Sequence, residues 1–206
     1  MKYKDNWSRL ENFDIYHAFK KDIIDQEEAI ITDVLKSMGT QCGQILEIGI
    51  GDGNLTQRLV NIMKFKSYEG IDVSDKAIKK ARSVLKNKNI SLSKKDANKF
   101  ETKKTYDLIL SLNSWYGIKT GKIRGYLDML NDKGVMIISV NAATNLKNDE
   151  LSTAKKIQDY LENENIPYTI RKDKILIEDT KAKNKYFSKV NIEHEKSEIT
   201  QVTFIL

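Results

Sequence analysis

The chain has 206 residues, of which 40% are hydrophobic and 31% charged, a composition typical of one globular domain with a full core. No apolar run approaches the length of a membrane span and the first residues lack the apolar core of a signal peptide, so we expect a cytoplasmic protein. The single cysteine, Cys42, excludes an internal disulfide. A net charge of +6 leaves nucleic-acid binding open, but the basic residues are scattered among acids rather than grouped, which favours solvated surfaces.

Residues 1–40 are expected to form a helical cap of the same domain whose main part spans 41–206. Apolar residues recur at three- and four-residue spacing over residues 14–38, which predicts a helix. Aromatic residues lead into this helix, and Tyr16 among them is a candidate for the substrate pocket. Packing of these aromatics on the edge of the sheet is the alternative.

Residues 45–56, Ile-Leu-Glu-Ile-Gly-Ile-Gly-Asp-Gly-Asn-Leu-Thr, are expected to organise the rest of the chain. The apolar run predicts a strand buried on both faces, the alternating glycines predict a turn, and Asn54 or Thr56 can begin a helix. A strand, a turn and a helix in this order place a ligand beyond the carboxyl end of the strand. Glu47, inside the strand, suits a cationic ligand better than a pyrophosphate.

This Glu-x-Gly-x-Gly-x-Gly stretch resembles the first motif of the class I S-adenosylmethionine-dependent methyltransferases. The resemblance implies that Glu47, Gly49, Gly51 and Gly53 bind S-adenosyl-L-methionine and that the product S-adenosyl-L-homocysteine leaves the same site. A glycine turn that binds no ligand is the alternative.

A second strand is expected over residues 67–74, with Asp72 at its end and a helix over 75–87 after it. A carboxylate there can accept hydrogen bonds from both hydroxyls of a ribose. The resemblance implies this role for Asp72 and places Val73 over the adenine. A third strand over residues 90–93 precedes Asp96 and Ala97, and the resemblance implies that Asp96 accepts from the adenine amino group, with Ala97 beside it in the cofactor site.

A fourth strand over residues 106–112 ends at Leu112 and runs into Asn113-Ser114-Trp115-Tyr116. The end of this strand should face the transferred methyl group, so we expect Leu112 to contact the cofactor and the residues after it to carry the substrate chemistry. Asn113 and Tyr116 are the candidate catalytic residues, and Trp115 is a candidate aromatic wall of the substrate pocket. Packing of Trp115 in the core is the alternative.

Residues 106–140 are similar to the histamine N-methyltransferase group, in which an Asp-led apolar strand also runs into an amide residue and an aromatic pair. The resemblance implies that Asn113 takes the place of a substrate-binding glutamine and Tyr116 that of the first tyrosine of the pair. It favours N-methylation of an amine.

The rest of the chain predicts a helix over residues 120–130, a fifth strand over 135–140 and a loop that begins at Asn141, a candidate for the second wall of the substrate pocket. A further helix and late strands follow, at 151–163, 168–170, 174–177 and 202–206. The connection between the last strands lacks a helix, which indicates an antiparallel pair.

Together these elements predict an α/β fold, a Rossmann-like doubly wound seven-stranded sheet with an antiparallel last strand, as in class I methyltransferases. We expect a methyltransferase that uses S-adenosyl-L-methionine and no metal, with a small-molecule amine as the methyl acceptor. An RNA or protein methyltransferase is one alternative, and a non-catalytic module that binds S-adenosylmethionine is the other. The sequence does not determine the oligomeric state.

Overall fold

The computed structural model describes residues 10–37, 43–86, 89–143, 149–176 and 198–206. Its centre is a seven-stranded sheet with the order β3-β2-β1-β4-β5-β7-β6. The strands are β1 Gln44–Ile48, β2 Ser67–Asp72, β3 Ile90–Lys94, β4 Tyr106–Leu112, β5 Leu130–Ala143, β6 Thr169–Leu176 and β7 Glu198–Ile205. The first five strands pair in parallel, whereas β7 runs antiparallel to both β5 and β6. The fold class predicted from the sequence is confirmed.

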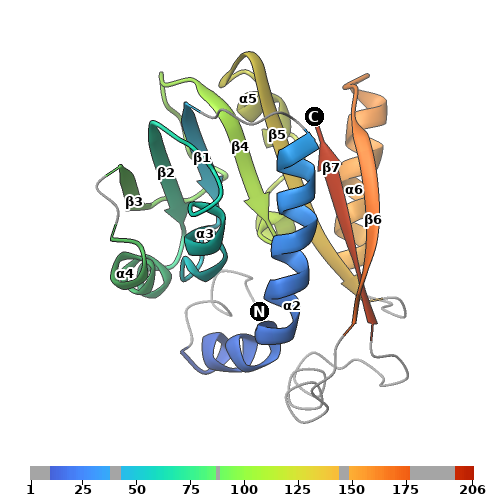
Figure 1. Ribbon diagram of the computed structural model, residues 1–206. Helices are drawn as coiled ribbons and strands as arrows, with labels where there is room; N and C mark the ends of the chain where they lie inside the picture. Colours follow the sequence, from blue (N-terminus) through green and yellow to red (C-terminus); the bar gives the residue numbers. More distant parts are fainter. Residues whose placement is uncertain (1–9, 38–42, 87–88, 144–148, 177–197) are drawn as a thin grey trace.

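Helices cover both faces of the sheet (Figure 1). On one face lie α2 Leu10–Ser37, α3 Asn54–Leu59 and α4 Asp75–Val84, and on the other lie the short 3-10 helix η1 Trp115–Gly117, α5 Lys122–Leu127 and α6 Asp149–Asn163. Neighbouring residues of β1 face opposite sides of the sheet. Ile45 packs in the core under α2, α3 and α4, and Leu46 packs in the core under η1, α5 and α6; both are at most 1% exposed. A strand buried on both faces reads as a continuous apolar run, as the sequence does here.

Among the element boundaries that differ from those predicted, two concern β5 and β6. Strand β5 begins at Leu130 and continues to Ala143, so the predicted helix over 120–130 shortens to α5, and Asn141 lies in a strand instead of a loop. The extension forms because Asn141 pairs with Gln201 of β7. The two strands predicted at 168–170 and 174–177 are one strand, β6, because its polar middle continues the pairing with β7; residue 177 lies outside the described residues.

Helix α2 is held to the domain by charged side chains. Arg58 of α3 donates to Glu28 at 2.8 Å and also bonds Asp25, and Arg171 of β6 donates to Asp33 at 2.5 Å. The pKa of Arg58 is raised by these two acidic partners. Within the described residues, no helix combines the length and the apolar character that a membrane span requires.

Candidate functional site

The turn after β1 depends on three glycines with positive φ, at 74° for Gly49, 59° for Gly51 and 79° for Gly53. A Cβ on Gly49 would lie 2.2 Å from the Cβ of Ser114, and one on Gly53 would lie 2.9 Å from a methyl of Leu85. At Gly51 a Cβ would meet nothing within 4 Å. Gly49 and Gly53 therefore allow close packing, whereas Gly51 leaves the backbone open to a ligand.

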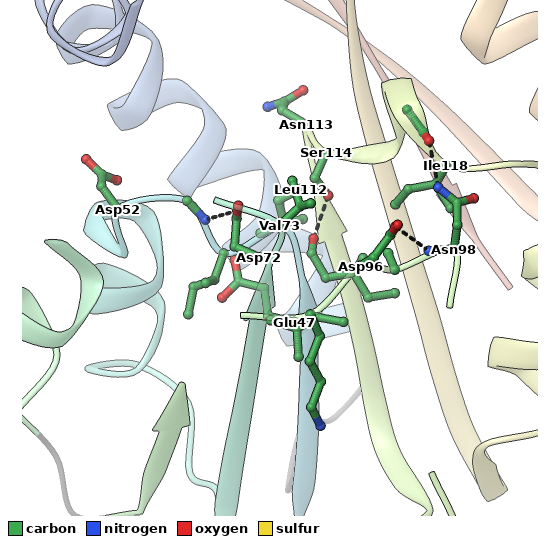
Figure 2. Close-up of a pocket in the computed structure, with 18 of the residues that line it drawn as sticks. Glu47, Asp52, Asp72, Val73, Asp96, Asn98, Leu112, Asn113, Ser114 and Ile118 are labelled. Atoms are coloured by element: carbon green, nitrogen blue, oxygen red, sulfur yellow. Dashed lines mark hydrogen bonds between the residues drawn. The ribbon is translucent and has the colours of Figure 1, made fainter. Parts of the chain in front are cut away.

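A pocket lies at the carboxyl ends of β1, β2 and β4, where this turn meets the loops after β2, β3 and β4 (Figure 2). It brings together most of the residues that the sequence nominated: Glu47, Gly49, Gly51, Asp72, Val73, Asp96, Ala97, Leu112 and Asn113 all line it. Parallel strands place their carboxyl ends at one edge of the sheet, which is why residues far apart in the chain meet here.

Asp72 is the last residue of β2, and its carboxylate contacts the glycine turn after β1. Its Oδ2 accepts the backbone N–H of Gly51 at 3.0 Å and its Oδ1 accepts that of Ser74 at 2.8 Å. Burial raises the pKa of Asp72, although these backbone hydrogen bonds act in the opposite direction. Because each carboxylate oxygen can accept more than one hydrogen bond, both remain able to accept from a ligand.

Glu47 is 3% exposed and lies beneath the glycine turn. Its Oε2 accepts the hydroxyls of Thr56 and Tyr68, both at 2.6 Å. Burial and the neighbouring carboxylate of Glu47 raise the pKa of Tyr68 well above its usual range, which keeps the phenol protonated as a donor. Oε2 of Glu47 thereby joins the start of α3 to strand β2.

Asn98 joins two loops at the pocket rim. Its backbone N–H donates to Oδ1 of Asp96 at 3.1 Å, its side-chain amide donates to the carbonyl of Gly117 at 2.9 Å, and its Oδ1 accepts the N–H of Lys119 at 2.9 Å. The loop after β3 is thereby fixed to the end of η1, with Ile118 lining the pocket between them. Sequence reasoning missed Asn98, although it stands two residues after a nominated acid.

Asn113 follows β4 with a φ of 52°, a conformation uncommon outside glycine that tends to occur at functional sites. Its backbone N–H donates to the carbonyl of Ser139 at 2.9 Å, and its side-chain amide donates to Oε1 of Glu27 on α2. Glu27 is 1% exposed. The Oδ1 of Asn113 is buried and makes no hydrogen bond within the described residues. With its donor engaged by Glu27, the amide presents an acceptor.

Two further pocket residues escaped the sequence reasoning. Asp52 lies between Gly51 and Gly53 and lines the pocket. Its carboxylate accepts the backbone N–H of Asn54 at 3.2 Å and the side-chain amide of Asn54 at 2.7 Å. Ser114 donates to the carbonyl of Ile48 at 2.5 Å and so joins the end of β4 to the end of β1. Asp52 lies within the glycine turn and Ser114 lies just after the fourth strand, two stretches singled out from the sequence. Their position in those stretches is the signal that could have identified them.

Trp115 and Tyr116 do not line the pocket. Trp115 is 1% exposed and packs edge-on against Tyr126 at 5.9 Å, on the sheet face covered by α5 and α6. Tyr116 is partly buried against the same core. The interpretation of Trp115 as a substrate wall is therefore corrected to that of a core residue, because the turn of η1 directs its ring away from the pocket.

Three more nominated residues lie elsewhere or beyond description. Gly53 is the N-cap of α3 and contributes the turn rather than the pocket lining. Asn141 lies within β5, paired to Gln201. Tyr16 lies in α2, and its side chain is outside the described part of the structure.

Comparison with known proteins agrees with this geometry. Residues 45–134 match the family model of a methyltransferase domain. A malonyl-[acyl-carrier protein] O-methyltransferase of Ilyobacter polytropus is 26% identical over 140 residues, which cover 66% of this chain and 52% of that protein. The chain thus spans about half the length of this curated relative.

Solved structures share the whole fold at low identity. The plantazolicin methyltransferase BpumL, solved with S-adenosylhomocysteine (SAH) and a triazolic desmethylPZN analogue, is 15% identical with a TM-score of 0.65, covering 99% of this chain and 94% of that chain. A methyltransferase from Thiobacillus denitrificans, also solved with SAH, is 14% identical with a TM-score of 0.59, covering 87% and 90%. The chain therefore has the fold of the class I S-adenosylmethionine-dependent methyltransferases, and its residues 45–134 match the methyltransferase domain.

Proposed function

We propose that this chain binds S-adenosylmethionine in the pocket and transfers its methyl group to a nitrogen of a small-molecule amine. The observation that carries the proposal is the joint placement of the open Gly51, the strand-end carboxylate of Asp72 and the buried acceptor of Asn113 at one pocket. In the proposal, Gly51 and Asp72 serve a nucleotide-like cofactor and Asn113 serves the acceptor, at the same edge of the sheet.

The charges of the pocket fit this cofactor. Four carboxylates line it, from Glu47, Asp52, Asp72 and Asp96, and its lysine, Lys95, is already paired with Glu69. S-adenosylmethionine carries a sulfonium, an ammonium and one carboxylate, with a net positive charge, together with a ribose that has two hydroxyl donors and an amino group on the adenine. In the proposal Asp72 accepts from the ribose, Asp96 accepts from the adenine amino group, and the charge of Glu47 faces the cationic methionine end.

When bound, the cofactor supplies a methyl group on a positively charged sulfur that is a good leaving group. The chain then needs to hold the nucleophile close, aligned and away from water. An amine that is protonated in water has to lose a proton before its lone pair is available. Asn113 accepts a hydrogen bond from the remaining N–H and so orients the nitrogen. Its contact with Glu27 keeps the amide from turning its NH₂ group toward the acceptor.

The test is transfer of labelled methyl from S-adenosylmethionine in an extract of small metabolites and, separately, in a fraction of RNA and protein. Label in basic small molecules is expected. Label confined to macromolecules would overturn the acceptor class, and no label together with no SAH binding in calorimetry would overturn the whole proposal.

Replacing Asn113 with alanine should lower kcat/KM about tenfold for the labelled acceptor, the usual effect of losing one hydrogen bond in a buried site. The matched control is Asn131→Ala. Asn131 donates to Asp107 at the opposite end of the sheet, outside the pocket, so its loss should leave transfer unchanged. Equal rates for the wild type and the Asn113 variant would exclude the role of this amide.

A further inference from the structure

Helix α2 packs on the sheet face over the strands from β4 to β6. Glu27 contacts Asn113 at the end of β4, and Asp33 accepts from Arg171 of β6 at 2.5 Å. The strand order places β5 and β7 between β4 and β6. The two contacts, about 9 Å apart along the helix axis, are thus made to the strands on either side of β5 and β7. Figure 1 shows α2 in front of this part of the sheet.

The sheet beneath this crossing carries buried polar side chains. Gln201 and Thr203 of β7 are both 0% exposed. Within the described residues, Nε2 and Oε1 of Gln201 and Oγ1 of Thr203 make no hydrogen bond. Their strand neighbours Val202 and Phe204 pack in the core on the α6 side. Because side chains alternate along a strand, Gln201 and Thr203 point to the face that α2 covers.

Strand register connects these residues to the pocket. Thr203 pairs with Ser139 of β5, and the N–H of Asn113 donates both to the carbonyl of Ser139 at 2.9 Å and to its Oγ at 3.3 Å. Paired Cα atoms of antiparallel strands lie about 5 Å apart. A polar row thus runs from the unpartnered Oδ1 of Asn113 through Ser139 and Thr203 to Gln201.

Unpaired polar atoms in a core cost free energy, and apolar residues of similar shape would remove that cost. Four such atoms gather along this row, from Asn113, Gln201 and Thr203. A ligand group that completes their hydrogen bonds explains why polar residues stand here. Gln201 offers a donor and an acceptor in one plane, which matches a carboxamide. A carboxylate fits poorly because Glu27, buried at 1% exposure, lies at the same wall.

We propose that Thr203 and Gln201 form a polar subsite beneath α2, next to Asn113, that binds a neutral amide-like group of the methyl acceptor. The subsite extends the proposed function and rests on it for the identity of its ligand. It would hold the acceptor at a second point, away from the nitrogen that receives the methyl group, and would make these β7 residues determinants of specificity.

The test uses acetamide as the probe and acetate as its charged counterpart, each titrated into the SAH-saturated protein. Side-chain amide resonances are followed by ¹H–¹⁵N NMR, and the pair that disappears in Gln201→Leu is assigned to Gln201. Acetamide should shift this pair in a saturable manner and acetate should not. In Thr203→Val the acetamide affinity should fall about tenfold, as expected for one lost hydrogen bond. An unshifted Gln201 pair, or equal responses to both probes, would overturn the subsite.

Two further measurements distinguish failure of the subsite from failure of the proposed function. Calorimetry of SAH with the wild type tests the cofactor site alone, and SAH binding without an acetamide response would overturn only the subsite. Both β7 variants should bind SAH as the wild type does and melt at the same or a higher temperature, because they remove unpaired polar atoms. A strong fall in melting temperature would instead show that Gln201 supports the fold, which overturns the proposal. Ser93→Ala is the control variant for the acetamide titration and should respond as the wild type does. It also removes an unpartnered buried hydroxyl, but on β3, at the far edge of the sheet from the subsite.

Discussion

Replacing Asp72 with alanine should weaken SAH binding by about 2 kcal/mol, or about 30-fold in Kd. The magnitude follows from the position of its carboxylate. Each oxygen already accepts one backbone N–H, from Gly51 and Ser74, and retains capacity for one ribose hydroxyl. A hydrogen bond to a charged acceptor is worth about 1.5–3 kcal/mol when it is lost. Two such bonds would sum to about 3–6 kcal/mol. We expect a smaller loss, about 2 kcal/mol, because the pocket is open to water and water replaces part of each lost bond.

Calorimetric titration of SAH at neutral pH measures this loss directly. Asp75→Ala is the matched control, because Asp75 lies three residues further on, is exposed, and pairs with Lys79 at 2.9 Å outside the pocket. The Asp72 variant also leaves two backbone N–H groups without their acceptor, so its melting temperature must be measured to show that it is folded. A folded Asp72 variant that binds SAH with the wild-type Kd would show that the ribose lies elsewhere.

The pH dependence of SAH binding gives a second arm to the same experiment. Burial raises the pKa of Asp72 above its usual value of 3.8, so this carboxyl group takes up a proton at a higher pH than an exposed aspartate does. Protonation removes the charge that strengthens the ribose bonds. Wild-type affinity should therefore fall as the pH drops through the raised pKa, whereas Asp72→Asn should show a flatter profile. Parallel profiles for the two proteins would contradict the assignment.

The glycine turn and the ion pairs of β2 allow two further predictions. Gly51→Ala should bind SAH about tenfold more weakly because its Cβ would enter the open pocket, and its φ of 59° should cost about 1–2 kcal/mol of stability. Gly49→Ala should chiefly lower the melting temperature, since its Cβ would lie 2.2 Å from that of Ser114. Burial raises the pKa of Glu69, but its bond to Lys104 contributes to a net lowering from 4.5. Glu69→Gln should therefore be less stable than the wild type by about 1 kcal/mol at neutral pH, and the two should converge as the pH falls below 4.5 in urea unfolding.

The residues of the proposed cofactor side of the pocket could be predicted from the sequence because their signals are local. The strand, the glycine turn and the acid of Asp72 are written in short stretches whose order along the chain fixes their place at one edge of the sheet. The capping role of Ser74, whose hydroxyl accepts the N–H of Ala77 at 3.3 Å, is equally local. Hydrophobic period and turn residues suffice for such features.

Trp115 shows where local pattern fails. An aromatic residue just after a strand end is compatible with a pocket wall and with core packing, and the choice depends on the direction of the backbone after Asn113. Because Asn113 has a positive φ and a 3-10 turn follows it, the Trp115 ring lies on the α5 side of the sheet and packs against Tyr126. No spacing rule predicts a single left-handed residue that is not glycine.

Asn113 could be nominated from the sequence, but Glu27 and Gln201, on the proposed acceptor side, could not, because they are brought near it only by the sheet order. Glu27 reads as one charge within a helix, and Gln201 reads as one polar position of a terminal strand. Glu27 reaches Asn113 from α2, and Gln201 stands on β7, which lies between β5 and β6. Contacts of such long sequence separation leave no periodic trace.

This division follows the boundary of the matched family domain. The residues proposed to hold the cofactor all lie within 45–134, as does Asn113, whereas Glu27, Ser139, Thr203 and Gln201 lie outside it, on α2, β5 and β7. A shared cofactor requires a shared turn and shared acids, but an acceptor is recognised by whatever the flanking helix and the antiparallel strand present to it. Variation in those two elements can therefore change the acceptor without disturbing the cofactor site, and the β7 variants separate the two functions within one chain.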